Sequence, residues 1–228
     1  QDTEFPDGAT ARALVPAMPE ELRELLRELD TAGRRGGGLL AAAGSLPSGT
    51  TDQVRLTILG ILLRAVSLPE QYPQARFCLW LHAQGFYEKV RTQVESAGKV
   101  FDKELNNLYV SGPIAKALLE CDKHFASSEA EARQTLRATY PPMARDITTE
   151  EFLGTLKDAL KLHGRDGRVP CTLLILDEVQ QYIGDSNDRS VLVTEVAEAV
   201  SKQLDSQVMI VGAGQSALTD VTLLHKLL

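Results

Sequence analysis

The sequence lacks several features that would place it in a specialised class of protein. It has only three cysteines in 228 residues, with no Cys-x-x-Cys or Cys/His spacing, which argues against a disulfide framework and a zinc site. No apolar run approaches the roughly 18 residues of a membrane span. The first residues are polar and acidic, so we expect no signal peptide. These absences predict a cytoplasmic protein with reduced thiols and no membrane association.

An excess of positive charge is also missing. The chain has 24 Lys and Arg against 31 Asp and Glu, a net charge of −7. This argues against broad, non-specific binding of nucleic acid. The content of hydrophobic residues, 43%, is sufficient for one sizeable domain or one domain with an insert. The chain also lacks an initiator Met, and we expect it to be an internal fragment or a processed product.

The most informative segment, 171–178, is an apolar run that ends in two carboxylates. It reads Cys-Thr-Leu-Leu-Ile-Leu-Asp-Glu and predicts a strand buried on both faces of a parallel sheet. Asp177 and Glu178 then lie at the C-terminal end of the strand, where open α/β sheets bind ligands. In the Walker B arrangement, Asp177 would hold Mg²⁺ through water and Glu178 would orient the attacking water. The alternative is that the pair only ends the strand and begins a turn.

A second apolar strand, 208–211, follows a helix expected over about 188–204, so we expect the two strands to be parallel neighbours. In the glycine-rich turn behind it, Gln215 or Ser216 would approach the γ-phosphate. A structural turn is one alternative. Another is a Rossmann-type oxidoreductase, because Gly212–Ala217 fits the dinucleotide fingerprint G-x-G-x-x-A.

The remaining pattern predicts an α/β core with a large helical insertion. Short strands are expected near 13–15 and 39–43, with a helix after Pro19 that carries leucines at i, i+3, i+4 and i+7 and ends in a loop at Gly33–Gly38. From 51 to about 162 the pattern is helical, with Thr51 as a candidate cap. Predicted capping boxes begin at Ser128 and Thr148. We therefore divide the chain into core residues 1–50, an insertion over 51–165 and core residues 166–228.

Two other motifs predict no site. Asp185–Asp188 offers oxygen ligands, but its spacing fails the calcium-loop pattern and indicates a helix N-cap. A triphosphate site needs the string Gly-x-x-x-x-Gly-Lys-Ser/Thr, which does not occur in the 228 residues. Gly98-Lys99 is followed by Val100 and lies in a helical region. If 171–178 is a Walker B strand, we expect its phosphate loop to lie before residue 1 or to have been lost.

Longer strings resemble a known family. Residues 173–185 (Leu-Leu-Ile-Leu-Asp-Glu-Val-Gln-Gln-Tyr-Ile-Gly-Asp) and 211–218 (Val-Gly-Ala-Gly-Gln-Ser-Ala-Leu) are similar to the large P-loop ATPase of BREX-type anti-phage systems and to its relative in phage growth limitation systems. Shorter similar strings lie at 39–47, 68–73, 75–77 and 104–111, so the resemblance runs over most of the chain.

This resemblance implies a cytoplasmic bacterial ATPase with an AAA-like nucleotide domain, using ATP and Mg²⁺. It implies work with other BREX components, including a DNA methyltransferase, hence an indirect association with DNA and an oligomer of the parent protein. The family's roles carry over to Asp177 for Mg²⁺, Glu178 for catalysis and Gln215 as a sensor, with Ser216 at the nucleotide. Because the chain contains neither the phosphate loop nor an arginine finger, we expect the fragment alone to be inactive. A non-hydrolysing ATPase-like scaffold, whose helices bind partners, remains an alternative.

Overall fold

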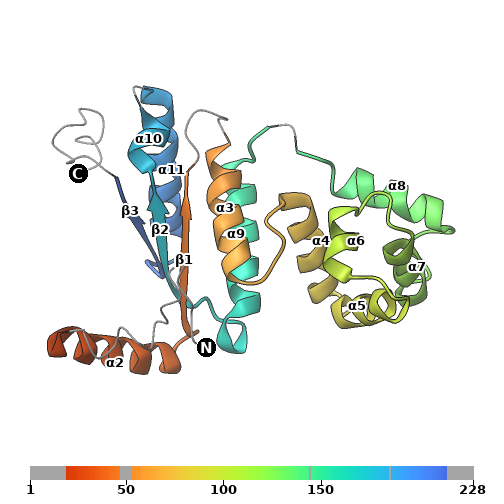
Figure 1. Ribbon diagram of the computed structural model, residues 1–228, viewed down its shortest axis with the longest axis horizontal. Helices are drawn as coiled ribbons and strands as arrows, with labels where there is room; N and C mark the ends of the chain where they lie inside the picture. Colours follow the sequence, from red (N-terminus) through yellow and green to blue (C-terminus); the bar gives the residue numbers. More distant parts are fainter. Residues whose placement is uncertain (1–18, 47–52, 144, 185, 215–228) are drawn as a thin grey trace.

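The computed structural model describes residues 19–46, 53–143, 145–184 and 186–214, and shows an α/β fold (Figure 1). Three parallel strands form one sheet in the order β1-β2-β3, which is also their order in the chain. They are β1 (Leu39–Ser45), β2 (Cys171–Asp177) and β3 (Val208–Gly212). The strands expected near 39–43, 172–176 and 208–211 are therefore confirmed, whereas the one expected at 13–15 lies outside the described residues.

The helices alternate with these strands along the chain. Of the described helices, one precedes β1, seven lie between β1 and β2 together with a short 3₁₀ turn, and two lie between β2 and β3. Their bounds are α2 (Glu20–Arg35), α3 (Val54–Ala65), α4 (Tyr72–Ala83), α5 (Tyr87–Ser96), α6 (Phe101–Asn106), α7 (Gly112–Cys121), α8 (Glu129–Thr139), α9 (Thr149–His163), the 3₁₀ turn η2 (Arg165–Gly167), α10 (Val179–Ile183) and α11 (Asn187–Gln203).

The predicted helix starts at Ser128, Thr148 and Asp185–Asp188 are confirmed, but only one of the two predicted capping boxes is complete. Thr148 and Glu151 form a complete capping box at the start of α9. Ser128 caps α8, but Glu131 bonds the backbone of Ser127 instead of completing the box. Ser186 caps α11 by accepting a hydrogen bond from the backbone N–H of Arg189, so this loop is a helix start.

Among the described residues, helices cover only one face of the sheet, and exposure alternates along β2, so the prediction that β2 is buried on both faces is wrong. Exposure alternates along β2: Leu174 and Leu176 are buried, whereas Leu173 and Ile175 are 36% and 37% exposed. The covering helices are α3, which packs on β1, and α11, which packs on β3, with α9 against both helices. The unbroken apolar run was wrongly interpreted because the second face, although apolar, has no layer of described residues upon it.

The helix α2 forms where the leucine spacing predicts it, but it continues through Gly33 to Arg35, so the loop expected at Gly33–Gly38 is shorter. Gly33 is buried against Leu39, at a distance that leaves no room for a side chain. Figure 1 shows α2 running across the N-terminal ends of the strands.

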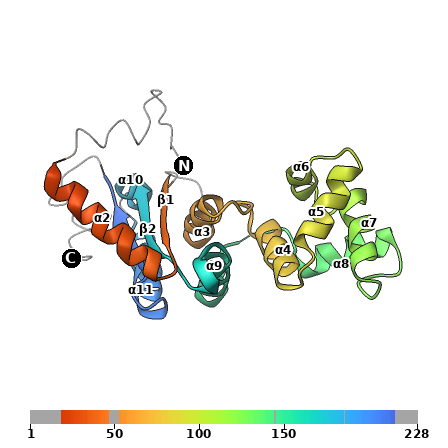
Figure 2. The same cartoon turned by 90° about the horizontal axis from the view of Figure 1, so that it is seen from below.

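Helices α4–α8 stand away from the sheet, beyond α3 and α9, in both views (Figures 1 and 2). Phe77, Leu81, Ile114 and Leu136 are fully buried in the hydrophobic core that continues from the sheet into this part. Within the region predicted to be an insertion, α3 thus packs on the sheet, α9 packs on α3, and α4–α8 project from these two helices.

One partly buried ion pair joins the covering helices. The Asp146 carboxylate accepts hydrogen bonds from the backbone N–H groups of Arg55 and Leu56, at 3.1 and 3.0 Å, and so caps α3 from 90 residues away. The Arg55 guanidinium lies 3.5 Å from Asp146, 3.2 Å from the Thr149 hydroxyl of α9 and 3.1 Å from Glu195 of α11. A single arginine therefore links α3, α9 and α11. The residue predicted to cap α3, Thr51, lies outside the described residues.

This arrangement predicts a large effect for Asp146→Ala. The substitution removes the partly buried carboxylate beside Arg55, whose side chain is only 13% exposed, and it also uncaps α3. We expect the free energy of unfolding to fall by roughly 3 kcal/mol in urea denaturation. Glu195→Gln is the control: the Glu195 side chain is 53% exposed, so its loss should cost under about 1 kcal/mol. Equal losses for the two variants would contradict this account.

Candidate functional site

The carboxyl end of β2 brings together the two acids identified from the sequence. Asp177 is the last residue of the strand and is exposed, and Glu178, half-buried, immediately precedes α10. The backbone N–H of Glu178 donates a 2.8 Å hydrogen bond to Asp177 Oδ1. This bond turns the chain sharply and fixes one carboxylate oxygen beside the strand end.

Glu178 adopts a backbone conformation that residues with side chains rarely occupy. Its φ and ψ angles are 58° and 23°, in the left-handed region. A residue other than glycine pays about 1–2 kcal/mol there, and such strain concentrates at functional sites. The sequence pattern gave no sign of it, because a strand followed by two acids is also compatible with an unstrained turn.

The glycine turn after β3 lies directly beside these acids, as the sequence predicts. Leu176 pairs with Gly212 in the parallel ladder. Beyond it, the Ala213 N–H donates to the Leu176 carbonyl at 2.8 Å, and the Val179 N–H donates to the Ala213 carbonyl at 3.2 Å. The predicted adjacency of the two strand ends is confirmed, whereas Gln215 and Ser216 lie outside the described residues.

The same turn bears on the dinucleotide alternative. A dinucleotide site needs open space at the second glycine, so that the backbone can approach a pyrophosphate. Gln180 occupies the space beside Gly214: a Cβ built there would meet the Gln180 Oε1 at 3.1 Å and its Cβ at 3.3 Å. The contact with Gln180 therefore gives Gly214 a packing role that does not depend on a bound dinucleotide.

Sequence reasoning missed Ser45 as a site residue. Ser45 ends β1, is exposed and pairs with Asp177 in the parallel register. The Leu46 N–H donates to the Asp177 carbonyl at 3.0 Å, which holds the two strand ends together. A polar residue directly after the apolar run of β1 was the available signal.

The donor set permits only a sparsely liganded metal. In the described part of the chain, no group of three or more His, Cys, Asp or Glu side chains gathers as a metal cluster would. Mg²⁺ is commonly held by one or two carboxylates together with water and substrate phosphates. The exposed Asp177 carboxylate, with Glu178 next to it, fits that mode and does not fit a zinc or calcium cage.

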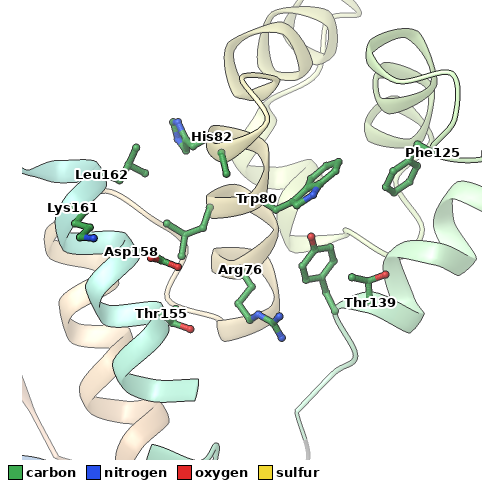
Figure 3. A pocket seen from close by; sticks show the side chains of 12 residues that line it. Arg76, Trp80, His82, Phe125, Thr139, Thr155, Asp158, Lys161 and Leu162 are labelled. Carbon is green, nitrogen blue, oxygen red and sulfur yellow. The ribbon is translucent and has the colours of Figure 1, made fainter. Parts of the chain in front are cut away.

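A cavity lies away from the strand ends, between α4 and α9 (Figure 3). It encloses about 770 Å³, and its lining combines aromatic side chains with charged ones from both helices. The labelled side chains include Arg76 and Trp80 on α4, and Asp158 and Lys161 on α9. None of the acids or glycines at the strand ends lines it, so it is a separate feature at the joint between the sheet part and α4–α8.

The charge of this cavity comes from Arg76, Lys161 and Asp158. Arg76 lies over the Tyr72 and Tyr140 rings, at 5.6 and 5.9 Å from their centroids. Burial raises the pKa of Tyr140 to about 12 and lowers that of His82, against the opposite effect of Glu88. Both groups are therefore neutral at pH 7.

No protein-family model matches the chain, and no curated protein or solved structure does so either. Among the helices that the structure describes, none is both long and apolar enough to cross a membrane. The residues at the strand ends are therefore the feature of the chain that points to a function.

The strained backbone of Glu178 predicts a reversal of the usual ranking of glycine and alanine. Because glycine tolerates positive φ, Glu178→Gly should be more stable than Glu178→Ala by about 1 kcal/mol. At Lys157, an exposed position within α9, the glycine variant should instead be less stable than the alanine variant by about 1 kcal/mol. Thermal and urea unfolding of the four variants checks this. The same ranking at both positions would contradict the strain.

Proposed function

We propose that this chain forms the water-orienting and metal-holding half of an ATP-hydrolysing site in a longer protein. The observation that carries the proposal is the juxtaposition at one sheet edge: two carboxylates at the end of β2, flanked by the end of β1 and by the glycine turn after β3. Ligands of open α/β sheets bind at this edge, and phosphoryl transfer requires a carboxylate there.

Each residue has a separate role in this proposal. The Asp177 carboxylate holds the water shell of Mg²⁺, and the ion, when bound, neutralises charge on the phosphates. Glu178 orients the attacking water and accepts its proton. The left-handed backbone of Glu178 supports this role, because it turns Glu178 away from the path that β2 would otherwise continue. Gln215 senses the γ-phosphate, and Ser216 contacts the nucleotide.

The phosphate-binding loop comes from elsewhere in the longer protein. The resemblance to BREX-type ATPases supports a role in bacterial phage defence, in the cytoplasm, together with a DNA methyltransferase. This resemblance comes from the sequence and does not depend on the fold. The geometry at the strand ends supports only the proposed nucleotide chemistry. The projecting helices α4–α8 would be the part of the chain that binds partners in that assembly.

The test measures ATP hydrolysis by the full-length protein that contains this chain. Glu178→Gln removes the proton acceptor while keeping size and shape, so kcat should fall by at least about 100-fold with little change in the KM for ATP. Asp177→Asn should instead raise the Mg²⁺ concentration that gives half-maximal activity. Glu150→Gln, an exposed acid in the first turn of α9, is the matched control and should leave both parameters unchanged.

Two outcomes would reject the proposal. Retention of kcat within about twofold in Glu178→Gln would remove Glu178 from the catalytic step. Absence of ATP hydrolysis in the unmodified full-length protein, with ATP still bound, would favour the non-hydrolysing scaffold.

A further inference from the structure

One face of the sheet has no described helix packed on it; we call it the open face, and it is apolar. Five large side chains point from it, and each is 36–63% exposed. Leu173 pairs with Met209 and Ile175 pairs with Val211 in the parallel register, and Leu39 lies on the same face of β1, beside Gly33 of α2. Parallel sheets are normally covered on both faces, and a contiguous apolar patch of this kind marks an interface. The five residues are Leu39, Leu173, Ile175, Met209 and Val211.

The helix α2 presents a second apolar surface without a covering layer in the described structure. Leu22, Leu25, Leu26 and Leu29 lie on one side of it and are 44–61% exposed. A helix with leucines at this spacing ordinarily buries them. Two uncovered apolar surfaces, one helical and one flat, therefore belong to the same chain.

The link between α2 and β1 keeps these two surfaces apart within one chain. The Gly36 N–H donates to the carbonyls of Ala32 and Gly33. The carbonyls of Gly37 and Gly38 accept hydrogen bonds from the backbone N–H groups of Arg165 and Cys171, at 2.9 and 3.0 Å. These bonds pin the link at both ends, so α2 runs across the strand ends instead of along the open face (Figures 1 and 2).

We propose that a second copy of this chain covers the open face. Two chains pair about a two-fold axis, with the leucines of each α2 against the open sheet face of the other. The dimensions agree, because the 16-residue α2 is about 24 Å long and the seven-residue strands β1 and β2 are about 23 Å long. A two-fold arrangement uses each surface once and closes the assembly. This pairing is independent of ATP hydrolysis.

The first test compares the mass of the chain in solution with that of a charged variant. Light scattering during size-exclusion chromatography should give a dimer, and Leu25→Glu with Leu29→Glu should raise the dimer Kd at least about 100-fold by placing charge in an apolar contact. Both leucines are exposed within one chain, so circular dichroism should show unchanged folding. Val110→Glu, at a 69% exposed site on the distant helical part, should leave the dimer intact. A monomer at every concentration, or an open-ended polymer, would overturn the proposal.

A disulfide test identifies which α2 covers the face. Cys171 is exposed at the start of β2 and shares the open face with Leu173 and Ile175. Burial raises the pKa of Cys78 to about 12 and also raises the pKa of Cys121, whereas Cys171 is exposed. The substitution Cys121→Ser removes the partly buried thiol, so that Cys171 is the thiol that reacts.

In that background, cysteine is placed in turn at positions 22, 25, 26 and 29 and the protein is oxidised. A bond to Cys171 that joins two chains, with doubled mass on a non-reducing gel, supports the proposal. A bond within one chain shows that α2 covers its own sheet, and overturns it. Formation of no bond at any of the four positions also overturns it. Oxidation of the background protein alone shows how much Cys171 pairs with itself.

Discussion

The direction in which the chain crosses the sheet determines most of what the structure shows. The strands lie in the same order in space as in sequence, so both connections step the same way. Because crossovers between parallel strands are almost always right-handed, two successive steps in one direction place their helices on the same face. This direction of crossing explains why α3, α9 and α11 lie in one layer on one side of the sheet and why the described residues leave the other side open. It also explains why three strand ends gather at one edge. The cluster around Arg55 then holds that layer together, because it joins one residue from each of the three helices or their starts.

Local patterns predicted the elements that local forces form. The three strands are apolar runs bounded by glycine, proline or charge, and the helix starts at Ser128, Thr148 and Ser186 carry side chains that cap within three residues. The parallel pairing of β2 and β3 was likewise predictable, because a single helix separates them. What a short window cannot contain is a contact across 90 residues, such as Asp146 with the start of α3. The uncovered face of β2 is a second case, since Leu173-Leu174-Ile175-Leu176 is apolar at every position and carries no mark of which face is covered.

The candidate site was predictable in composition but not in conformation. Asp177 and Glu178 were identified because two adjacent acids at the end of an apolar strand are costly unless they have a role. The left-handed backbone of Glu178 and the neighbouring Ser45 became visible only when the strands were aligned. The strain and the hydrogen bonds at the strand end have one physical basis, which is the sharp turn of the chain after β2. The hydrogen bonds between Glu178 and Asp177 and between Val179 and Ala213 stabilise that turn.

The position of Trp80 gives the protein a built-in optical probe. It is the only tryptophan of the chain, and it lies on α4 in the wall of the cavity that faces α9. Its ring neighbours Phe77, Phe86 and Phe125, at 6.1, 6.1 and 5.7 Å, all belong to the part that projects from the sheet. Any rotation of that part relative to α9 changes the solvent around the indole while these aromatic contacts remain. The intrinsic fluorescence of the unlabelled protein therefore follows movement at this joint, separately from events at the strand ends.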